Sequence, residues 1–367
     1  MLPIVSVALP LVFIICLLGY VLDGTIVGPW LVTMLQYSDE GFTLILSFLH
    51  SLSAFSYAMV SAHYSIMQTV CFMFICIIGV LPCWRGKYYS ICVLTTALCI
   101  SFMAIPYSSA RWYLHVLDVG QGTAMVITKG RRAIVVDTGP SHNGNAPVVT
   151  NVIPKILTQY GVNNVDHVVH SHSDNDHAGG RKALTLWLAR MGYKAQWYSP
   201  LKGCERGKKI HWQGLTLAFL WPLKGNHVDS NNTSCVLRIT DGENTLLLPG
   251  DIERSAEYAL LQKEKTMSAD VLVAPHHGSL TSSTNIWVKR VQPQTVIYTQ
   301  GFENRWQFPA TDVTKRYAYN GVKQYLTSYH GYIKATFGKE SFYIDTQRRT
   351  LHKRWYLPGI APRHLDE

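Results

Sequence analysis

Histidine and aspartate side chains are concentrated in one short stretch of this 367-residue chain, between residues 170 and 177. The stretch follows Val168-Val169, whose β-branched side chains indicate the buried end of a strand, and it leads into Gly179-Gly180, where the backbone can turn sharply. A loop anchored in this way can bring several imidazole and carboxylate groups to one point. Such groups are the usual ligands of hydrolytic metal ions.

The stretch contains two competing registers of a metal-binding motif. The first, His170-x-His172-x-Asp174, would need an imidazole at position 175, where the chain has Asn. The second, His172-x-Asp174-x-Asp176-His177, is complete and differs from an H-x-H-x-D-H motif only by a carboxylate in place of the second imidazole. We prefer the second register and interpret His170 as an ordinary residue at a strand end. Because single His and Asp residues are mostly structural, this interpretation depends on further motifs.

Two later strand ends also carry potential ligands. Asp251 follows the apolar run 246–248 and the turn Pro249-Gly250, while His276 and His277 follow the run 271–274. The ends of separate strands can meet at one edge of a sheet, so ligands from distant parts of the chain can converge there. Asp251 would suit a carboxylate that bridges two ions, although a turn aspartate is an equally common explanation for one such residue alone. One member of the His276/His277 pair suffices as a ligand, and the sequence does not decide which.

The composition of the chain changes near residue 106. Residues 1–106 contain two basic residues, Arg85 and Lys87, and three acidic ones. The rest of the chain holds 31 basic and 20 acidic residues, a formal net charge of +11. This balance favours anionic partners such as nucleic acid, phospholipid headgroups or other phosphates, although many proteins are basic only for solubility.

Apolar runs in the first part predict membrane helices. Residues 2–22, 66–84 and 88–107 are each long enough to cross a hydrocarbon layer of roughly 30 Å. A weaker run covers 25–35, and 41–60 suits an amphipathic or interfacial helix. The segment 2–22 lacks a basic region and a cleavage site, so we expect it to be retained. The basic loop 85–87 predicts a cytoplasmic position, which places residue 108 onward on the outer, periplasmic or external, side of the inner cell membrane.

The second part is predicted to be rich in β-strands, with helices at 147–160 and 181–191. The run 111–122 is expected to form an alternating strand that ends in a glycine turn. Further strands are expected near 124–128, 133–136, 165–169, 215–220, 234–239, 245–248, 271–274, 296–299, 331–337 and 341–344. Six of the eight cysteines lie in the apolar first part, where they act as small hydrophobic side chains. Cys204 and Cys235 could pair in an oxidising compartment, but the sequence does not show that they are close.

Together the candidate ligands resemble the metallo-β-lactamase superfamily, and their surroundings are similar to the soluble domain of the DNA-internalisation competence protein family, ComEC. The resemblance covers residues 112–345 and rests on six motifs in order. They are Leu117-Asp118-Val119-Gly120-Gln121-Gly122, Val136-Asp137-Thr138-Gly139, Ser171-His172-Ser173-Asp174-Asn175-Asp176-His177-Ala178-Gly179-Gly180, Asn232-Thr233-Ser234-Cys235-Val236-Leu237, Leu248-Pro249-Gly250-Asp251-Ile252 and Ala274-Pro275-His276-His277-Gly278-Ser279.

The resemblance implies an α/β fold, a metallo-β-lactamase-like αββα sandwich preceded by an α-helical transmembrane segment. The expected organisation is membrane helices at 1–107, a hydrolase domain at 108–347 and a C-terminal tail at 348–367. The implied function is that of a metal-dependent nuclease which degrades one DNA strand while the other enters the cell in natural transformation. Its partners would be DNA, the membrane and other uptake proteins or a separate channel subunit. Family members have a further external domain and more spans, so we expect a fragment or one half of a split protein.

The chain departs from the superfamily pattern at two motifs. Asp174 stands where the superfamily has its second His, and Asn232-Thr233-Ser234 occupies the third motif without a His. Each change replaces nitrogen by oxygen, and oxygen-rich sites favour hard ions, so we expect one or two ions of Mn²⁺, with Mg²⁺ or Zn²⁺ as alternatives. The segment 304–309 resembles a family segment near the site, with Phe308 where relatives often have His.

The predicted reaction is hydrolysis of a phosphodiester. The expected metal ligands are His172, Asp174, Asp176, His177, Asp251 and one of His276 and His277, and the catalytic residues are Asp176, His172 and Asp251, with Asp176 orienting the attacking water or accepting its proton. Substrate contacts are expected from Ser234, Ser279, Asn232, Asn304 and Arg305, although the two serines more often cap local backbone. A DNA strand would be followed by Arg181, Lys182, Lys208 and Lys209, with Trp197, Trp212 or Trp306 for stacking.

Two other functions remain open at the level of sequence. One is a membrane-tethered metallo-hydrolase of another phosphate ester or of a lipid-derived substrate. The other is a non-catalytic DNA channel or binding module with a vestigial metal site.

Overall fold

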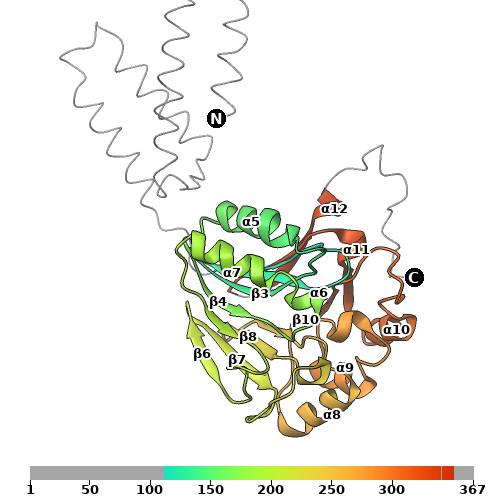
Figure 1. Ribbon diagram of the computed structural model, residues 1–367. Helices are drawn as coiled ribbons and strands as arrows, with labels where there is room; N and C mark the ends of the chain where they lie inside the picture. Colours follow the sequence, from blue (N-terminus) through green and yellow to red (C-terminus); the bar gives the residue numbers. More distant parts are fainter. Residues whose placement is uncertain (1–110, 340, 351–367) are drawn as a thin grey trace, which may run out of the picture. The chain divides into compact units, whose positions relative to one another are not determined.

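Two seven-stranded β-sheets lie face to face at the centre of the computed structural model, which describes residues 111–339 and 341–350 (Figure 1). The first sheet contains β1 (Trp112–Val116), β2 (Ala124–Lys129), β3 (Arg132–Thr138), β4 (Asn164–Val169), β5 (Gln196–Tyr198), β13 (Ile333–Phe337) and β14 (Phe342–Thr346). The second contains β6 (Lys209–Trp212), β7 (Leu215–Trp221), β8 (Val236–Thr240), β9 (Thr245–Leu248), β10 (Val271–Val273), β11 (Thr295–Tyr298) and β12 (Lys323–Leu326).

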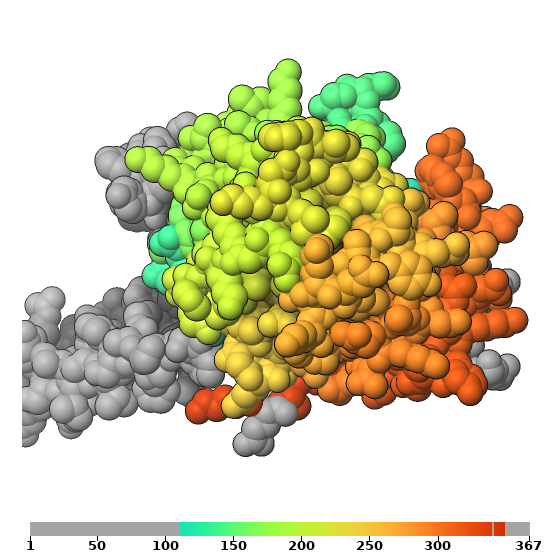
Figure 2. All heavy atoms as spheres, turned by 90° about the horizontal axis from the view of Figure 1, so that it is seen from below, coloured from blue at the N-terminus to red at the C-terminus, as the bar shows by residue number. Residues whose placement is uncertain are grey.

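Helices cover the outer faces of both sheets (Figure 1). The π-helical turn Val148–Val152, α5 (Ile153–Gln159) and α7 (Arg181–Arg190) pack on the first sheet, and α8 (Arg254–Lys263), α9 (Asn285–Val291) and α10 (Thr311–Tyr319) pack on the second. In the space-filling view from below, segments that follow residue 200 form most of the visible described surface (Figure 2). The predicted αββα sandwich is therefore confirmed.

Apolar strands with both faces covered hold the layers together. Alternate residues of β2 enter two cores: Ile127 packs between the sheets with Phe219, whereas Val126 packs beneath the helices with Leu184. All of these side chains are fully buried. A strand buried on both faces is apolar along its length, which is why the run Ala124–Thr128 contains almost no polar residue.

The strand order brings the carboxyl ends of several strands to one edge of the sandwich. In the first sheet β3, β4 and β5 are parallel neighbours, and in the second β9, β10, β11 and β12 are parallel neighbours. The order is β14-β13-β1-β2-β3-β4-β5 in one sheet and β12-β11-β10-β9-β8-β7-β6 in the other. Loops after parallel strands emerge at the same edge, where binding residues of α/β sheets usually lie.

Cys204 and Cys235 form a disulfide, which settles the pairing that the sequence leaves open. The bond joins the segment after β5 to the residue before β8, and both cysteines are buried. The backbone N–H of Cys235 donates a 2.8 Å hydrogen bond to the carbonyl of Ser171, one residue before His172. The disulfide therefore lies close to the predicted metal loop.

The predicted membrane helices in residues 1–107 lie outside the described residues, as does most of the predicted tail. Within 111–339 and 341–350, no helix combines the length and the apolar character that a membrane crossing requires.

Candidate metal centre

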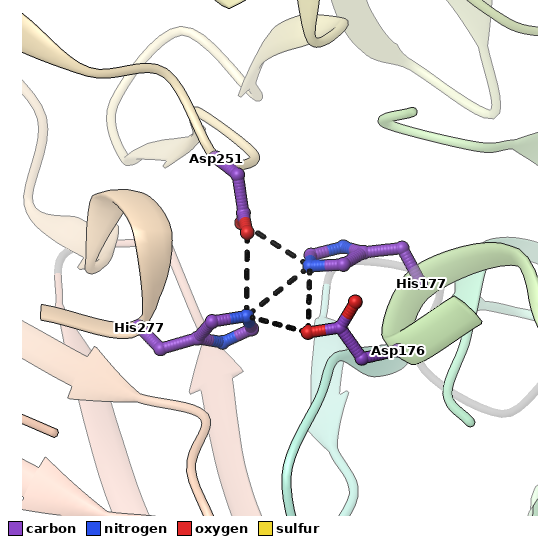
Figure 3. A group of neighbouring side chains, drawn as sticks. All are labelled: Asp176, His177, Asp251 and His277. Atoms are coloured by element: carbon purple, nitrogen blue, oxygen red, sulfur yellow. Dashed lines mark hydrogen bonds and ion pairs between the residues drawn. The ribbon is translucent and has the colours of Figure 1, made fainter. Parts of the chain in front are cut away.

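Four of the predicted ligands, Asp176, His177, Asp251 and His277, point toward one another at the common edge of the two sheets (Figure 3). One ligand atom from each residue lies within 4.8 Å of the others. The Nε2 atom of His177 is 3.2 Å from Oδ1 of Asp251, and Nε2 of His277 is 3.3 Å from Oδ2 of Asp251. Asp176 Oδ2 is 3.3 Å from His277 Nε2. Asp251 thus faces both imidazoles with its two oxygens.

Short segments after three strands hold these four residues. Asp176 and His177 lie in α6 (Asn175–Ala178), soon after β4. Asp251 follows β9 through Gly250, and His277 lies in the turn Pro275–Gly278 after β10. Both His276 and His277 have a positive φ, a conformation that costs energy in a residue with a side chain. The surrounding fold holds this strained turn in place.

The Nδ1 atom of each of the two imidazoles lies within hydrogen-bonding distance of a polar side chain outside the cluster. His177 Nδ1 is 2.9 Å from Oδ2 of the buried Asp137, and His277 Nδ1 is 3.1 Å from the hydroxyl of Thr299. Thr299 is in turn 2.8 Å from the hydroxyl of Thr123. Because one ring nitrogen is engaged in this way, Nε2 is fixed as the atom that faces the cluster. Metal-binding histidines are usually oriented by such outer partners.

The charged side chains of the cluster shift one another's pKa values. Burial opposes protonation of His177, but Asp251 and Asp137 outweigh burial and raise the pKa of this imidazole well above its usual value. The same balance, dominated by Asp251 and Asp176, raises the pKa of His277 to about 9. Burial opposes ionisation of Asp251, but His177 and His277 hold the pKa of its carboxyl well below the usual range. The buried carboxylates therefore attract positive charge to this point.

A second group of candidate ligands, His172, Asp174 and His276, lies beside the four-residue cluster. His172 Nε2 is 3.5 Å from Oδ2 of Asp174 and 3.9 Å from Oδ2 of Asp251, and His276 Nε2 is also 3.9 Å from Asp251 Oδ2. The hydroxyl of Ser171 lies 3.1 Å from His172 Nδ1. His172 is 1% exposed, yet its Nε2 has no hydrogen-bond partner in the described structure.

These residues fit a divalent metal ion. Two imidazole nitrogens and two carboxylate oxygens within one cluster form a donor set that suits a catalytic transition metal. A buried imidazole nitrogen without a partner is costly unless something binds it, and His172 Nε2 is such an atom. Burial, followed by His177, lowers the pKa of His172, so the ring is neutral, which is the form that binds metal. His172, Asp174, Asp251 and His276 would provide a second position beside the first.

The remaining predicted site residues hold loops around the cluster. Ser234 is fully buried, and its hydroxyl accepts a 3.1 Å hydrogen bond from the backbone of Asp251. Asn232 bonds Glu253 through both ends of its amide group. Ser279 contacts the hydroxyl of Thr281 at 3.0 Å. The side chains of these three residues thus shape the loops that carry Asp251 and His276.

Three further residues named in the sequence analysis, His170, Asn304 and Arg305, lie outside the four-residue cluster. His170 is buried and packs beside Trp197, with ring centroids 5.4 Å apart. Asn304 bonds the backbone of Gly301 and Phe308 and so closes its own loop. Arg305 is exposed and lies over the ring of Trp306.

Sequence reasoning did not assign roles to three residues that orient the ligands, namely Asp137, Ser171 and Thr299. The hydroxyl of Ser171 donates to Asp137 at 2.8 Å and lies 3.0 Å from His177 Nδ1. Asp137 lies in the motif Val136-Asp137-Thr138-Gly139 at the end of a predicted strand, and this motif is the sequence signal that could have identified it. Thr299 follows the apolar end of β11, and no sequence pattern distinguishes it from other strand-end threonines.

Comparison with known proteins supports the interpretation of the cluster as a metal centre. Residues 117–299 match the Metallo-beta-lactamase superfamily. "Uncharacterized protein YcaI" of Escherichia coli is 34% identical over 252 residues, which are 67% of this chain and 33% of that protein. "Recombination protein 2" of Haemophilus influenzae is 31% identical over 263 residues, 69% of this chain and 32% of the relative. "Competence protein ComA" of Neisseria gonorrhoeae is 30% identical over 256 residues, 69% of this chain and 36% of the relative.

The chain spans about a third of the length of the curated relatives it matches. The six motifs, the fold and these matches agree with one another. The chain therefore belongs to the ComEC family of competence proteins, and its residues 117–299 carry a metallo-β-lactamase domain.

Proposed function

We propose that the chain is a membrane-anchored, metal-dependent nuclease that hydrolyses the non-transported DNA strand during DNA uptake. The observation that carries this proposal is the convergence of Asp176, His177, Asp251 and His277, with the unpartnered Nε2 of His172 beside them. Two relatives are named for competence and recombination, which supports DNA as the substrate. The excess of basic residues after residue 106 supports an anionic substrate in general.

The residues of the cluster have distinct tasks in this proposal. His177, His277, Asp176 and Asp251 would hold one ion, and His172, Asp174, Asp251 and His276 would hold a second. When bound, an ion would lower the pKa of a water and offset negative charge on the scissile phosphate. Asp176 orients the attacking water and accepts its proton. Asp137 and Thr299 keep the two imidazoles in their orientations.

Exposure indicates the side from which the substrate enters. The side chain of Asp251 is 6% exposed, whereas those of Asp176 and Asp174 are 33% and 62% exposed. The side chain of His276 is 19% exposed. The scissile phosphate therefore approaches past Asp174, Asp176 and His276, and Asp251 forms the floor of the site.

Mn²⁺ is our first choice of ion. The carboxylates of Asp176 and Asp251 in the cluster, with Asp174 beside His172, give the site a large share of oxygen ligands, which favours Mn²⁺ or Mg²⁺. Zn²⁺ is the competitor, since it accepts the same mixed ligands.

The proposed location of the hydrolase domain is the outer side of the inner membrane, with helices in residues 1–107 as the anchor. The Cys204–Cys235 disulfide supports this location, because structural disulfides persist in oxidising compartments. There the domain would meet incoming DNA together with other uptake proteins or a separate channel subunit.

A nuclease assay tests the proposal. The 367-residue chain is purified in detergent, freed of metal with a chelator, and incubated with end-labelled single-stranded DNA and Mn²⁺, Mg²⁺ or Zn²⁺. We expect cleavage with Mn²⁺ and loss of cleavage in Asp176→Asn, which keeps the shape of the side chain but removes its charge. The matched control is Asp312→Asn, an exposed aspartate in the first turn of α10.

Each rival function predicts a different result. Hydrolysis of small phosphate esters without DNA cleavage would indicate a hydrolase for another ester and would contradict the nuclease. A chain that binds DNA, does not hydrolyse it, and keeps the same metal content after the Asp176→Asn change would be a binding module with a vestigial site.

A further inference from the structure

A cavity of about 630 Å³ lies beside the metal centre. Its lining includes Gln300, Arg305, Gln307, Phe308, Ser328 and Tyr329. Small-molecule sites commonly have volumes in this range and combine aromatic walls with a few polar groups. Neither the cluster of ligands nor the proposed hydrolysis accounts for this cavity.

Phe308 connects the cavity to the metal centre. Its ring lies 6.3 Å from that of His277 at an interplanar angle of 24°, and 5.8 Å from the ring of His276. On the other side, the ring of Trp306 lies 6.4 Å from that of Phe308 at an angle of 17°. Three nearly parallel rings, those of His277, Phe308 and Trp306, therefore lead from a metal ligand toward the surface. Trp306 is 48% exposed, so part of its side chain is open to a ligand.

A cation lies at the outer end of this row of rings. The guanidinium of Arg305 is 4.2 Å from the centroid of the Trp306 ring, and Arg305 also lines the cavity. An exposed arginine stacked on an aromatic ring keeps its positive charge available to a phosphate. The combination of a flat apolar surface and a nearby cation matches the two halves of a nucleotide, its base and its phosphate.

Gln300 provides an unused hydrogen-bond acceptor in the lining. Its side chain is 1% exposed, its Nε2 donates a 2.8 Å hydrogen bond to the hydroxyl of Ser328, and its Oε1 has no partner in the described structure. A buried carbonyl oxygen without a donor is unusual in a native fold. A ligand with an N–H group at its edge, as nucleobases have, would supply the missing donor.

The other two tryptophans considered for stacking are placed differently. Trp212 is 5% exposed and donates its indole N–H to Asp166. Trp197 packs beside His170, with Arg181 over its ring. Of the three, Trp306 is the exposed one whose ring is connected to the metal centre, through the ring of Phe308.

We propose that this cavity is a nucleobase subsite, which holds one unpaired base of the DNA strand next to the scissile phosphate. The base packs against Phe308 in the lining, and the ring of Trp306, stacked on Phe308, extends this aromatic surface. The edge of the base donates to Gln300 Oε1, and Arg305 binds a neighbouring phosphate. This inference rests on the proposed nuclease function and narrows it, because a base inside a duplex cannot enter the subsite. The chain is thereby selective for single-stranded or frayed DNA.

The test compares two probes of equal charge. A labelled thymidine decamer and a decamer of abasic deoxyribose phosphates are titrated with the metal-free 367-residue chain in detergent, and binding is followed by fluorescence anisotropy. We expect the thymidine decamer to bind about tenfold more tightly than the abasic one, as loss of base stacking predicts. Trp306→Ala should remove this preference and Trp306→Phe should keep it. The matched control is Tyr258→Ala, because Tyr258 is 44% exposed but lies in α8.

Equal affinity of the wild-type chain for both probes would overturn the subsite, as would a Trp306→Ala chain that keeps the preference and binds the same amount of Mn²⁺ as wild type. The nuclease proposal is tested separately by the cleavage assay. Cleavage of DNA without a binding preference for bases would support the nuclease and contradict the subsite. A preference for bases without DNA cleavage in the presence of any tested ion would support the subsite and contradict the nuclease.

Discussion

The Nε2 atoms of His177 and His277 lie 3.2 Å apart, although 100 positions separate these residues in the sequence. His177 belongs to the loop after β4 in the first sheet, and His277 to the turn after β10 in the second. Each ring is held at Nδ1 by a residue of its own side, Asp137 or Thr299. The contact therefore depends on how the two sheets pack, and the metal centre is a property of the interface between them.

Thr299→Val should weaken metal binding without unfolding the domain. The change keeps the shape of the side chain but removes the hydroxyl that lies 3.1 Å from His277 Nδ1. Loss of such an outer partner typically lowers metal affinity about 10- to 100-fold. Competition with a fluorescent chelator measures the affinity for Mn²⁺. The corresponding change at Thr314, a threonine of α10, serves as the control, and equal affinities in both variants would contradict the role of Thr299.

Gly250→Ala should reduce metal binding and stability by more than the backbone cost of a left-handed conformation in a residue with a side chain. Gly250 has φ +59°, and a Cβ there would lie 2.8 Å from Cβ of Ser234 and 2.9 Å from Cβ of Ser171. Gly130 has nearly the same φ, +57°, but open space around it, so Gly130→Ala isolates the backbone cost of about 1–2 kcal/mol. Urea unfolding and metal content measure both variants. Normal metal content in Gly250→Ala would show that the loop tolerates the added atom.

Stability should fall in mild acid because of His115. Burial, reinforced by the charge of Lys334, lowers the pKa of this imidazole to about 3, so the folded state keeps it neutral. The unfolded chain takes up this proton below its usual pKa near 6.5, so the stabilisation is present above that pH and is lost as the pH falls toward 3. Between pH 7.5 and 5 the loss should be about 2 kcal/mol.

Urea unfolding followed by tryptophan fluorescence, to which the buried Trp112 contributes, measures this pH dependence. His115→Asn removes the titrating group, so its stability should depend less on pH than that of the wild-type chain. The comparison of the two slopes separates His115 from the other histidines, and identical slopes would rule out its contribution.

Replacement of both Cys204 and Cys235 by alanine should lower the free energy of unfolding. The disulfide closes a segment with a sequence separation of 31, for which loop-closure entropy predicts a loss of about 4 kcal/mol. Alanine avoids a buried hydroxyl at these two positions, which are 1% and 2% exposed. The thermal midpoint of the wild-type chain should also fall on addition of a reductant, and that of the double variant should not. A wild-type midpoint that reductant does not change would argue against a stabilising bond.

The sequence alone predicted much of the site, because its ligands stand beside strong local signals. Apolar strands followed by turn residues indicate His172, Asp176, Asp251 and the His276-His277 pair as candidate ligands. The same strand pattern, read with the family motifs, predicted the αββα fold. These features are local in the chain, since the residues that form a strand end and the ligand that follows it are neighbours.

The tertiary structure decided what depends on distances across the sandwich. It placed His277 rather than His276 in the four-residue cluster, and it joined Cys204 to Cys235. It also brought Thr299 behind His277 and the row of rings from His277 to Trp306 beside the cavity. No local pattern encodes these contacts, because they arise when two sheets pack and fix the positions of loops that are far apart in the sequence.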